Sequence, residues 1–275
     1  MILYKERKQL FKYIKSLINW QDKLLYLSGY SRKNISMPDF IIAGLPKCGT
    51  VWLVDTLKQH SKINYIENPF FKEKHEIRFF SRNFNFPIKK YFDAFKNKEK
   101  GHLYFEKSPD YSIMSTARIK LIKKLNPEIK IILIFRDPIT RTYSHAKMDL
   151  IRTKGLQINK ENEHLFFKHY KNTSQIYDYP SIIKKWESVF QKEALLYLSL
   201  EQIKEDPKLV TQKILEFLGV QDTFEFSFSE AKNISKAKPI PEDHKAYIEK
   251  LNQQTINFWQ NNQKLFLVKD KNQSS

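Results

Sequence analysis

Cysteine is almost absent from this 275-residue sequence, which contains only Cys48. A single cysteine cannot form an intrachain disulfide, which is consistent with a reducing compartment, so we expect a cytoplasmic protein. Six glycines and eleven prolines exclude a low-complexity or collagen-like chain. Charges interrupt every apolar run before it reaches about 18 residues, so the sequence predicts neither a signal peptide nor a transmembrane segment.

Acidic residues are also in short supply, with 30 Asp and Glu against 48 Lys and Arg, which gives a formal net charge of +18. This excess indicates a partner that carries phosphates, sulfates or carboxylates. A general bias toward Lys, Ile and Asn explains the excess equally well. The 41% hydrophobic content and the length fit one large α/β domain with a substantial core.

The first 27 residues have the pattern of an amphipathic helix, in which leucines and isoleucines share one stripe with lysines between them. The favoured interpretation is that this helix packs against the domain. The alternative is peripheral contact with an anionic membrane surface, which makes the protein membrane-associated. We expect this helix and a linker over residues 1–37, the main domain over residues 38–268, and a disordered tail over residues 269–275.

The most informative stretch, residues 38–53, is typical of a strand, a phosphate-binding loop and a helix. Residues 40–43 are apolar, Gly44 ends the run, and a helix restarts near Thr50. Free backbone N–H groups at such a helix start bind anions, and Lys47 lies where it reaches a phosphate. The loop lacks the Gly-Lys-Ser/Thr of a Walker A motif. The alternative is a tight turn with a solvated lysine.

Cys48 lies within this loop, where the anion-binding environment favours a lowered pKa of its thiol. No histidine neighbours it in the sequence, so we interpret it as a small loop residue and not as a nucleophile.

Two further strands are predicted at residues 103–106 and 129–135, each followed by polar residues and a helix. Two such units imply a parallel sheet, whose carboxyl edge is where open α/β folds bind ligands. Lys107 and Ser108 follow the first of these strands. Arg136 follows the second, and Ser144 comes two helical turns later, so both are expected to contact a second phosphate.

A carboxylate, Glu76, stands in the charged run at residues 72–78, directly before two phenylalanines. A carboxylate held at such a buried edge can act as a general base. Taken alone, the run is better interpreted as a solvated charged segment. Residues 151–173 form a long polar stretch that we interpret as a substrate lid.

Together these segments resemble the sulfotransferases that use 3′-phosphoadenosine 5′-phosphosulfate (PAPS), and among them the heparan-sulfate-type carbohydrate sulfotransferases. Residues 47–50 resemble the family's 5′-phosphosulfate loop and residues 136–144 its 3′-phosphate motif. Residues 76–80 and 107–109 resemble the segments that carry the catalytic glutamate and lysine. Residues 201–207 and 217–220 resemble the C-terminal half of the family's domain.

The resemblance implies a P-loop-like, three-layer α/β fold with a central parallel sheet flanked by helices. It implies transfer of a sulfuryl group from PAPS to a hydroxyl or amino group of a carbohydrate, such as an anionic polysaccharide or a glycolipid. Glu76 is the implied base, and Lys47 and Lys107 stabilise charge; no metal and no nucleic acid is expected. Donor-binding residues are implied at Lys47, Cys48, Gly49, Thr50, Val51, Trp52, Arg136, Ser144, Lys236, Ala237 and Lys238.

The sequence departs from the family pattern at three positions. Val51 replaces a hydroxyl residue, His75 stands where glycan-modifying relatives often have lysine, and Ala237 replaces a glycine near the 3′-phosphate. Trp52 resembles the tryptophan that stacks on adenine in cytosolic members. His75 and His145 are alternative bases, ranked below Glu76. A P-loop kinase or nucleoside triphosphatase and a basic nucleic-acid-binding protein remain the alternative functions.

Overall fold

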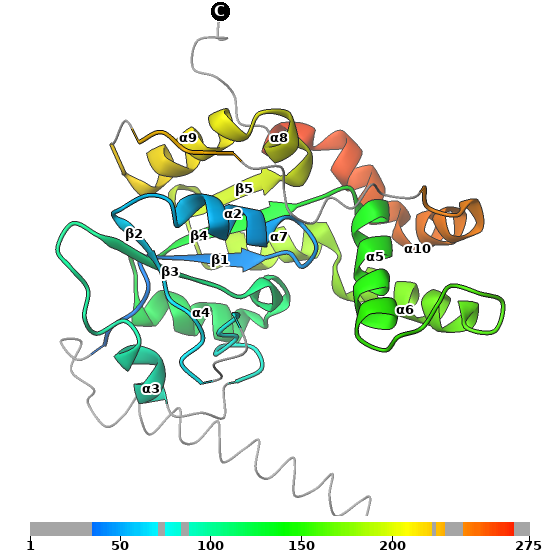
Figure 1. Ribbon diagram of the computed structural model, residues 1–275, viewed down its shortest axis with the longest axis horizontal. Helices are drawn as coiled ribbons and strands as arrows, with labels where there is room; N and C mark the ends of the chain where they lie inside the picture. Colours follow the sequence, from blue (N-terminus) through cyan, green and yellow to red (C-terminus); the bar gives the residue numbers. More distant parts are fainter. Residues whose placement is uncertain (1–34, 71–74, 84–87, 222–223, 229–238, 267–275) are drawn as a thin grey trace, which may run out of the picture.

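The computed structural model describes residues 35–70, 75–83, 88–221, 224–228 and 239–266 (Figure 1). The predicted N-terminal helix, the tail after residue 268, and Lys236, Ala237 and Lys238 lie outside the described residues. None of the described helices is both long and apolar enough to cross a membrane.

Within the described residues, five strands form one sheet in which every pairing is parallel, so the predicted parallel sheet is confirmed. Their order across the sheet is β2-β3-β1-β4-β5. The strands are β1 (Phe40–Gly44), β2 (Ile63–Tyr65), β3 (Leu103–Lys107), β4 (Lys130–Phe135) and β5 (Leu195–Ser199).

The central strands are buried on both faces, which explains their continuous apolar runs. All five residues of β1 are buried, and in β4 only the first residue is partly exposed. Phe40 and Phe105 stack across β1 and β3 with ring centroids 4.6 Å apart. Fully burying one such side chain stabilises a fold by about 1.5–3 kcal/mol, so these runs fix the centre of the core.

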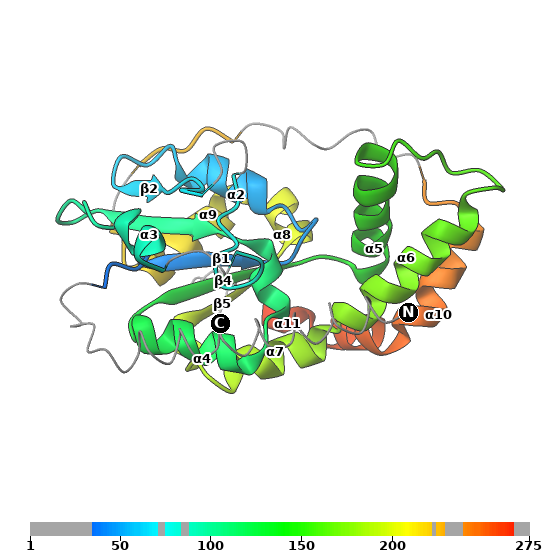
Figure 2. The same ribbon diagram turned by 90° about the horizontal axis from the view of Figure 1, so that it is seen from below.

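Helices cover both faces of the sheet and complete the three-layer α/β fold that the sequence predicts (Figures 1 and 2). One face carries α2 (Thr50–Leu57), α8 (Leu200–Glu205) and α9 (Pro207–Leu218). The other carries α4 (Thr116–Leu125), α7 (Tyr179–Glu187) and α11 (Gln263–Phe266). Shorter elements complete the connections: α3 (Ile88–Asp93), η2 (Pro109–Ile113) and η4 (Lys192–Ala194).

A second group of helices packs beside the sheet around a small core of its own that includes Phe166 and Tyr170 (Figure 2). It comprises α5 (Pro138–Ala146), the π-helical turn η3 (Lys147–Arg152), α6 (Glu163–Ile176) and α10 (Glu242–Asn261). The second half of residues 151–173, the stretch interpreted as a substrate lid, is therefore helical, and the lid role stays a prediction. That half belongs to α6, whose apolar side packs against α5 and α10.

The order of the strands places the sheet's topological switch point beside β1. The chain passes from β1 to β2 and β3 on one side, and then crosses to β4 and β5 on the other. In open parallel sheets, the loops that leave the carboxyl ends of the strands at such a point form a ligand-binding crevice. The loops after β1, β3 and β4 meet at this edge, where Lys47 and Arg136 lie in the loops and Lys107 ends β3.

Gly44, the last residue of β1, lets the chain after β3 approach closely. Its φ is +136°, and a Cβ added there would lie 2.5 Å from the carbonyl oxygen of Pro109 and 2.9 Å from the Cβ of Ser112. Backbone atoms cannot move aside as a flexible side chain can, so only glycine fits. The contact joins β1 to η2 directly beneath the edge that carries Lys107.

We therefore predict that Gly44→Ala lowers the free energy of unfolding by about 2–4 kcal/mol, through overpacking and backbone strain together. Gly101→Ala is the matched control, because Gly101 also has a positive φ of +82° but nothing within 4 Å of an added Cβ. It should cost only about 1 kcal/mol. Urea unfolding of both variants measures the difference, and equal losses would show that the close approach is not needed.

Candidate active site at the carboxyl edge of the sheet

The loop between β1 and α2 has the backbone geometry of an anion site. Lys47 and Gly49 adopt positive φ values of 67° and 86°, and Gly49 caps the amino end of α2. Alternation of left-handed residues with others turns successive N–H groups toward one concavity, to which the helix dipole adds positive potential. The predicted strand, loop and helix are confirmed. Lys47 is not glycine, so its left-handed backbone is a strained feature of the loop.

Positive charge accumulates around this loop. Burial lowers the pKa of Lys47, and Arg136 and Arg152 lower it further by repulsion between like charges. These cations come from the β1 loop, from the end of β4 and from η3. A group of cations gathered beside free backbone N–H groups attracts an anionic ligand.

Cys48 is fully buried in the loop, and its Sγ lies 3.6 Å from the carbonyl oxygen of Pro46. Burial raises the pKa of this thiol to about 12, although Arg141 and Arg136 oppose the shift. The expectation of a lowered thiol pKa is therefore wrong, because desolvation outweighs the nearby positive charge. The interpretation as a small loop residue fits this burial.

Arg136 ties the β1 loop to the start of α5. Its Nη1 donates to the carbonyl oxygen of Lys47 at 3.2 Å, and its Nε donates to Oγ1 of Thr140 at 3.1 Å. The hydroxyl of Tyr179 donates to the carbonyl oxygen of Arg136 at 2.7 Å and fixes the backbone there. Ser144 lies on α5, as predicted, one turn beyond Thr140 and half-buried. Sequence reasoning missed Thr140, the side chain that orients Arg136.

Glu76 and Lys107, which the sequence predicts separately, form an ion pair with 3.1 Å between Oε1 and Nζ. The other carboxylate oxygen of Glu76 accepts from Nε of Arg78 at 2.6 Å and also from its Nη2. Burial opposes ionisation of Glu76, but Lys107 and Arg78 outweigh it and hold the pKa of this carboxyl below its usual range. Glu76 is therefore ionised near neutral pH and able to accept a proton.

The surroundings of this pair fix its geometry. Lys107, the last residue of β3, is only 5% exposed, so its ammonium group has little access to water. The carbonyl oxygen of Glu76 accepts from Nδ2 of Asn68 at 2.7 Å. Arg78 also faces Asp110 at 3.5 Å. The solvated-segment interpretation of Glu76 therefore does not hold, because its carboxylate is mostly buried and held by two cations.

Trp52, on α2, packs against Phe228, with ring centroids 6.4 Å apart and planes 21° from parallel. Both residues are partly exposed, so together they offer apolar surface beside the loop between β1 and α2. Phe228 was missed at the sequence level, because it lies 176 positions further along the chain. Val51, the neighbouring residue that was also predicted to bind the donor, is 47% exposed.

The structure also brings His145, Asp149 and His169 together, a cluster that the sequence analysis did not foresee. Nε2 of His169 lies 2.9 Å from Oδ2 of Asp149, and Nε2 of His145 lies 3.6 Å from the same atom. Burial lowers the pKa of His145 to about 4, with help from Arg141. Its imidazole is therefore neutral at neutral pH.

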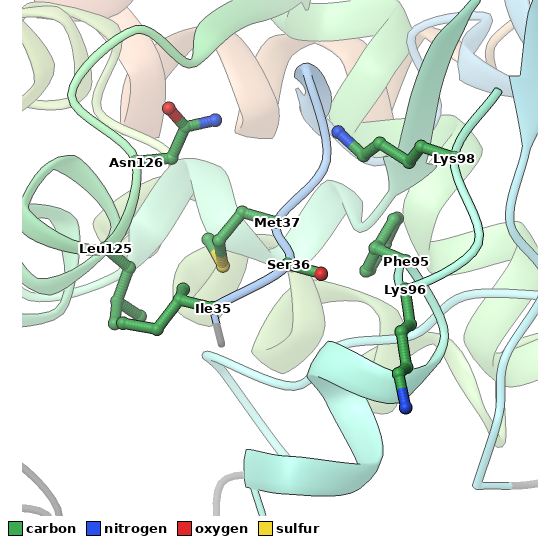
Figure 3. Close-up of a pocket in the computed structure, with 8 residues that line it drawn as sticks. All are labelled: Ile35, Ser36, Met37, Phe95, Lys96, Lys98, Leu125 and Asn126. Atoms are coloured by element: carbon green, nitrogen blue, oxygen red, sulfur yellow. The ribbon is translucent and has the colours of Figure 1, made fainter. Parts of the chain in front are cut away.

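A pocket of about 290 Å³ lies at the opposite edge of the sheet (Figure 3). Its walls come from segments that precede β1, β3 and β4, and hence from the amino ends of these strands. The lining residues are Ile35, Ser36, Met37, Phe95, Lys96, Lys98, Leu125 and Asn126. None of the residues predicted for the site lines it, so it is separate from the candidate active site.

Comparison with known proteins agrees with this geometry. The model of the sulfotransferase domain family matches residues 37–266. Mouse heparan sulfate glucosamine 3-O-sulfotransferase 3B1 is 27% identical over 204 residues, which cover 71% of this chain and 49% of that protein. A mouse bifunctional heparan sulfate N-deacetylase/N-sulfotransferase 4 is 28% identical over 216 residues, covering 74% and 24% respectively.

The chain thus spans about half the length, or less, of these curated relatives. Among solved structures, a sulfotransferase from Alicyclobacillus acidocaldarius aligns with a TM-score of 0.58 and 21% identity, over 82% of this chain and 100% of that one. That likeness concerns the fold. The family model covers most of the chain, and the residues it matches include the loop between β1 and α2, the Glu76–Lys107 pair and Arg136. The chain belongs to the sulfotransferase domain family.

Proposed function

We propose that this protein transfers a sulfuryl group from PAPS to a hydroxyl or amino group of a carbohydrate. The observation that carries the proposal is the Glu76–Lys107 ion pair, which lies at the same edge of the sheet as the phosphate loop. This arrangement supplies a base, a buried cation and an anion-binding loop. Family membership argues against a nucleoside triphosphatase and against a nucleic-acid-binding protein.

The donor occupies the switch point in this proposal. The backbone N–H groups of residues 47–50 and the ammonium group of Lys47 bind the 5′-phosphosulfate, while Arg136 and Ser144 bind the 3′-phosphate. Trp52 and Phe228 offer stacking surface for adenine, where each base–aromatic contact is worth about 1–3 kcal/mol. The lysines provide the positive charge that a metal ion supplies in many phosphoryl-transfer enzymes.

In the transfer step the acceptor oxygen or nitrogen attacks sulfur in line. A bond forms between the acceptor and sulfur, and the bond from sulfur to the bridging oxygen of the 5′-phosphate breaks, so that 3′,5′-phosphoadenosine leaves with the electron pair. Glu76 takes the acceptor's proton. Lys107 and Lys47 stabilise the charge on the sulfuryl group and the bridging oxygen, and positioning and electrostatics supply most of the rate enhancement.

The relatives named above act on heparan sulfate, and this supports a carbohydrate acceptor here. Within the proposal the acceptor is an anionic polysaccharide or a glycolipid. The net charge of +18 attracts an acceptor that carries negative charge. A cytoplasmic location, inferred from the single cysteine, belongs to the same proposal, with packing of the helix predicted at residues 1–27 against the domain as the favoured interpretation and membrane contact as the alternative.

Transfer of radiolabelled sulfate from PAPS onto a panel of glycosaminoglycans, bacterial polysaccharides and glycolipids tests the function. Label on at least one carbohydrate, lost when that carbohydrate is omitted, is the expected result. Label on none of them, from a protein that binds 3′,5′-phosphoadenosine, would contradict the carbohydrate acceptor.

Removal of the Arg136 guanidinium tests the 3′-phosphate site. Arg136→Ala loses a charge-assisted contact, so 3′,5′-phosphoadenosine should bind about 1.5–3 kcal/mol more weakly, which is roughly one to two decades in Kd. Lys208→Ala removes one exposed positive charge from α9, so it controls for the change in the protein's overall electrostatic attraction of the nucleotide. Calorimetric titration measures both, and unchanged affinity in Arg136→Ala would place the 3′-phosphate elsewhere.

Replacement of the base should separate chemistry from binding. Glu76→Gln keeps the size of the side chain but cannot accept a proton near neutral pH, so kcat should fall by about 10²–10⁴ while the affinity for 3′,5′-phosphoadenosine stays nearly intact. The assay uses saturating acceptor, because Glu76 also lies where it can orient the sugar.

Glu99→Gln is the matched control at a carboxylate that is 73% exposed, and it should leave kcat unchanged. Full turnover in Glu76→Gln, together with its loss in His145→Ala, would assign the base to histidine.

A further inference from the structure

Glu106 is a buried carboxyl group that the transfer step does not use. It precedes Lys107 on β3, and its side chain is 0% exposed. It accepts hydrogen bonds from the hydroxyls of Tyr91 at 2.6 Å, Ser108 at 2.9 Å and Tyr111 at 3.3 Å. In the part of the chain that the structure describes, no ion pair includes Glu106. Burial of a carboxyl group without a cationic partner is energetically unfavourable, so its place here needs a physical explanation.

Two of these three hydroxyls also hold the segment that carries Glu76. The backbone N–H of Arg78 donates to Oγ of Ser108 at 2.8 Å. The backbone N–H of Phe80 donates to the hydroxyl of Tyr111 at 3.1 Å. The hydroxyls thus connect Glu106, inside the sheet, to the backbone of a loop that is far away in sequence.

The direction of these hydrogen bonds depends on Glu106. An ionised carboxylate only accepts, so it draws the hydroxyl hydrogens of Ser108 and Tyr111 toward itself and leaves their lone pairs facing Arg78 and Phe80. A neutral carboxyl or an amide at the same place has a donor of its own. That donor competes for one of the same lone pairs, and the hydrogen of that hydroxyl then needs another acceptor.

The segment that carries Glu76 has a strained backbone at Arg78, the residue whose side chain contacts Glu76. Arg78 has a φ of 51°, an uncommon value for a residue with a side chain, and its guanidinium contacts the carboxylate of Glu76. Such a conformation persists only when surrounding contacts enforce it. The hydrogen bond from its N–H to Ser108 is one of these contacts, so the chain of bonds runs from Glu106 through Ser108 and Arg78 to Glu76.

We propose that Glu106 is a positioning residue, which fixes the backbone of Arg78 and Phe80 through Ser108 and Tyr111 and thereby orients Glu76. Its effect on turnover rests on the proposed sulfuryl transfer. Its effect on the loop backbone does not, so the two can be tested separately.

The ionisation of Glu106 adds a pH dependence. Burial raises its pKa to about 7, against the opposing effect of the three hydroxyls. Tyr65 faces it from β2, Tyr91 from α3 and Tyr111 from η2, and burial raises the pKa of all three phenols, so they stay neutral in this range. Of the charged groups, Arg78 lies one hydrogen bond beyond Ser108, through its backbone N–H, and Glu76 lies one further, through the guanidinium of Arg78.

The sign of this effect follows from linkage. Because the pKa of Glu106 is higher in the folded state than in the unfolded state, its contribution to stability is present at low pH and is lost as pH rises through about 7. Positioning requires the ionised form. The hold on Arg78 therefore improves as pH rises through about 7, the point at which the stabilising contribution of the neutral carboxyl has been lost.

Hydrogen–deuterium exchange of the peptide that spans residues 75–83 tests the proposal directly. Near pH 8, Glu106→Gln should raise the exchange rates of the Arg78 and Phe80 amides by about 3- to 10-fold relative to the wild type, as expected for one weakened hydrogen bond. Near pH 6 the two proteins should converge, because the wild-type carboxyl is then neutral too. Glu99→Gln should match the wild type at both pH values.

Unchanged exchange in Glu106→Gln near pH 8, or a ratio that does not vary with pH, would overturn the proposal. If the variant fails to fold, the same exchange measurement on the wild type tests the proposal. The protection of residues 75–83, relative to a β4 peptide, should then rise between pH 6 and pH 8, and constant protection would refute the proposal.

Turnover is the second readout. Glu106→Gln should have a lower kcat than the wild type near pH 8, at unchanged affinity for 3′,5′-phosphoadenosine. Faster exchange in a protein without transfer activity would support Glu106 and contradict the proposed function.

Discussion

Parallel pairing of β1 with β3 on one side and β4 on the other is the constraint on which the site depends. Because the three strands point the same way, the loops after them reach one edge, and residues from three separate parts of the sequence meet there. The close approach at Gly44 locks the β1 end against η2. The sheet therefore does more than fill the core, since its register determines where Lys47, Lys107 and Arg136 lie.

Several groups at this edge of the sheet have electrostatically or conformationally unfavourable arrangements. Lys47 and Arg78 both have positive φ values, Lys107 is nearly buried, and Glu106 is a carboxyl group with no cationic partner among the residues that the structure describes. Each feature is unfavourable when considered alone, and each is compensated by a specific neighbour. Such compensated strain is typical of functional sites, where groups are held ready for a ligand and not for maximal stability.

Much of this arrangement is readable from the sequence, because the signals are local. Continuous apolar runs such as residues 129–135 identify buried strands, and Gly44 followed by Thr50 marks the loop and the helix start. Glu76 and Lys107 were each predicted from a short motif. Their 3.1 Å contact was not, because it depends on how the segment after β2 folds back onto β3.

The features that sequence reasoning missed all depend on tertiary packing. Burial of the loop reverses the expected pKa shift of Cys48, and burial is not a property of the loop sequence. The cluster of His145 and His169 exists because α6 packs on α5, whereas the sequence of residues 151–173 is polar and only weakly periodic and did not indicate a packed helix. Trp52 indicates a stacking surface, but its partner Phe228 lies in a segment without regular structure.

The central claim is that this edge of the sheet recognises the phosphates of a nucleotide. Thermal unfolding with 3′,5′-phosphoadenosine and with adenosine, at equal concentrations, tests it most directly, because a ligand stabilises a fold only as far as it binds the folded state. A rise in Tm with 3′,5′-phosphoadenosine and none with adenosine is the predicted result, with smaller rises for the two adenosine monophosphates. Equal shifts for 3′,5′-phosphoadenosine and adenosine would show that Lys47 and Arg136 do not bind phosphate, and would contradict the claim.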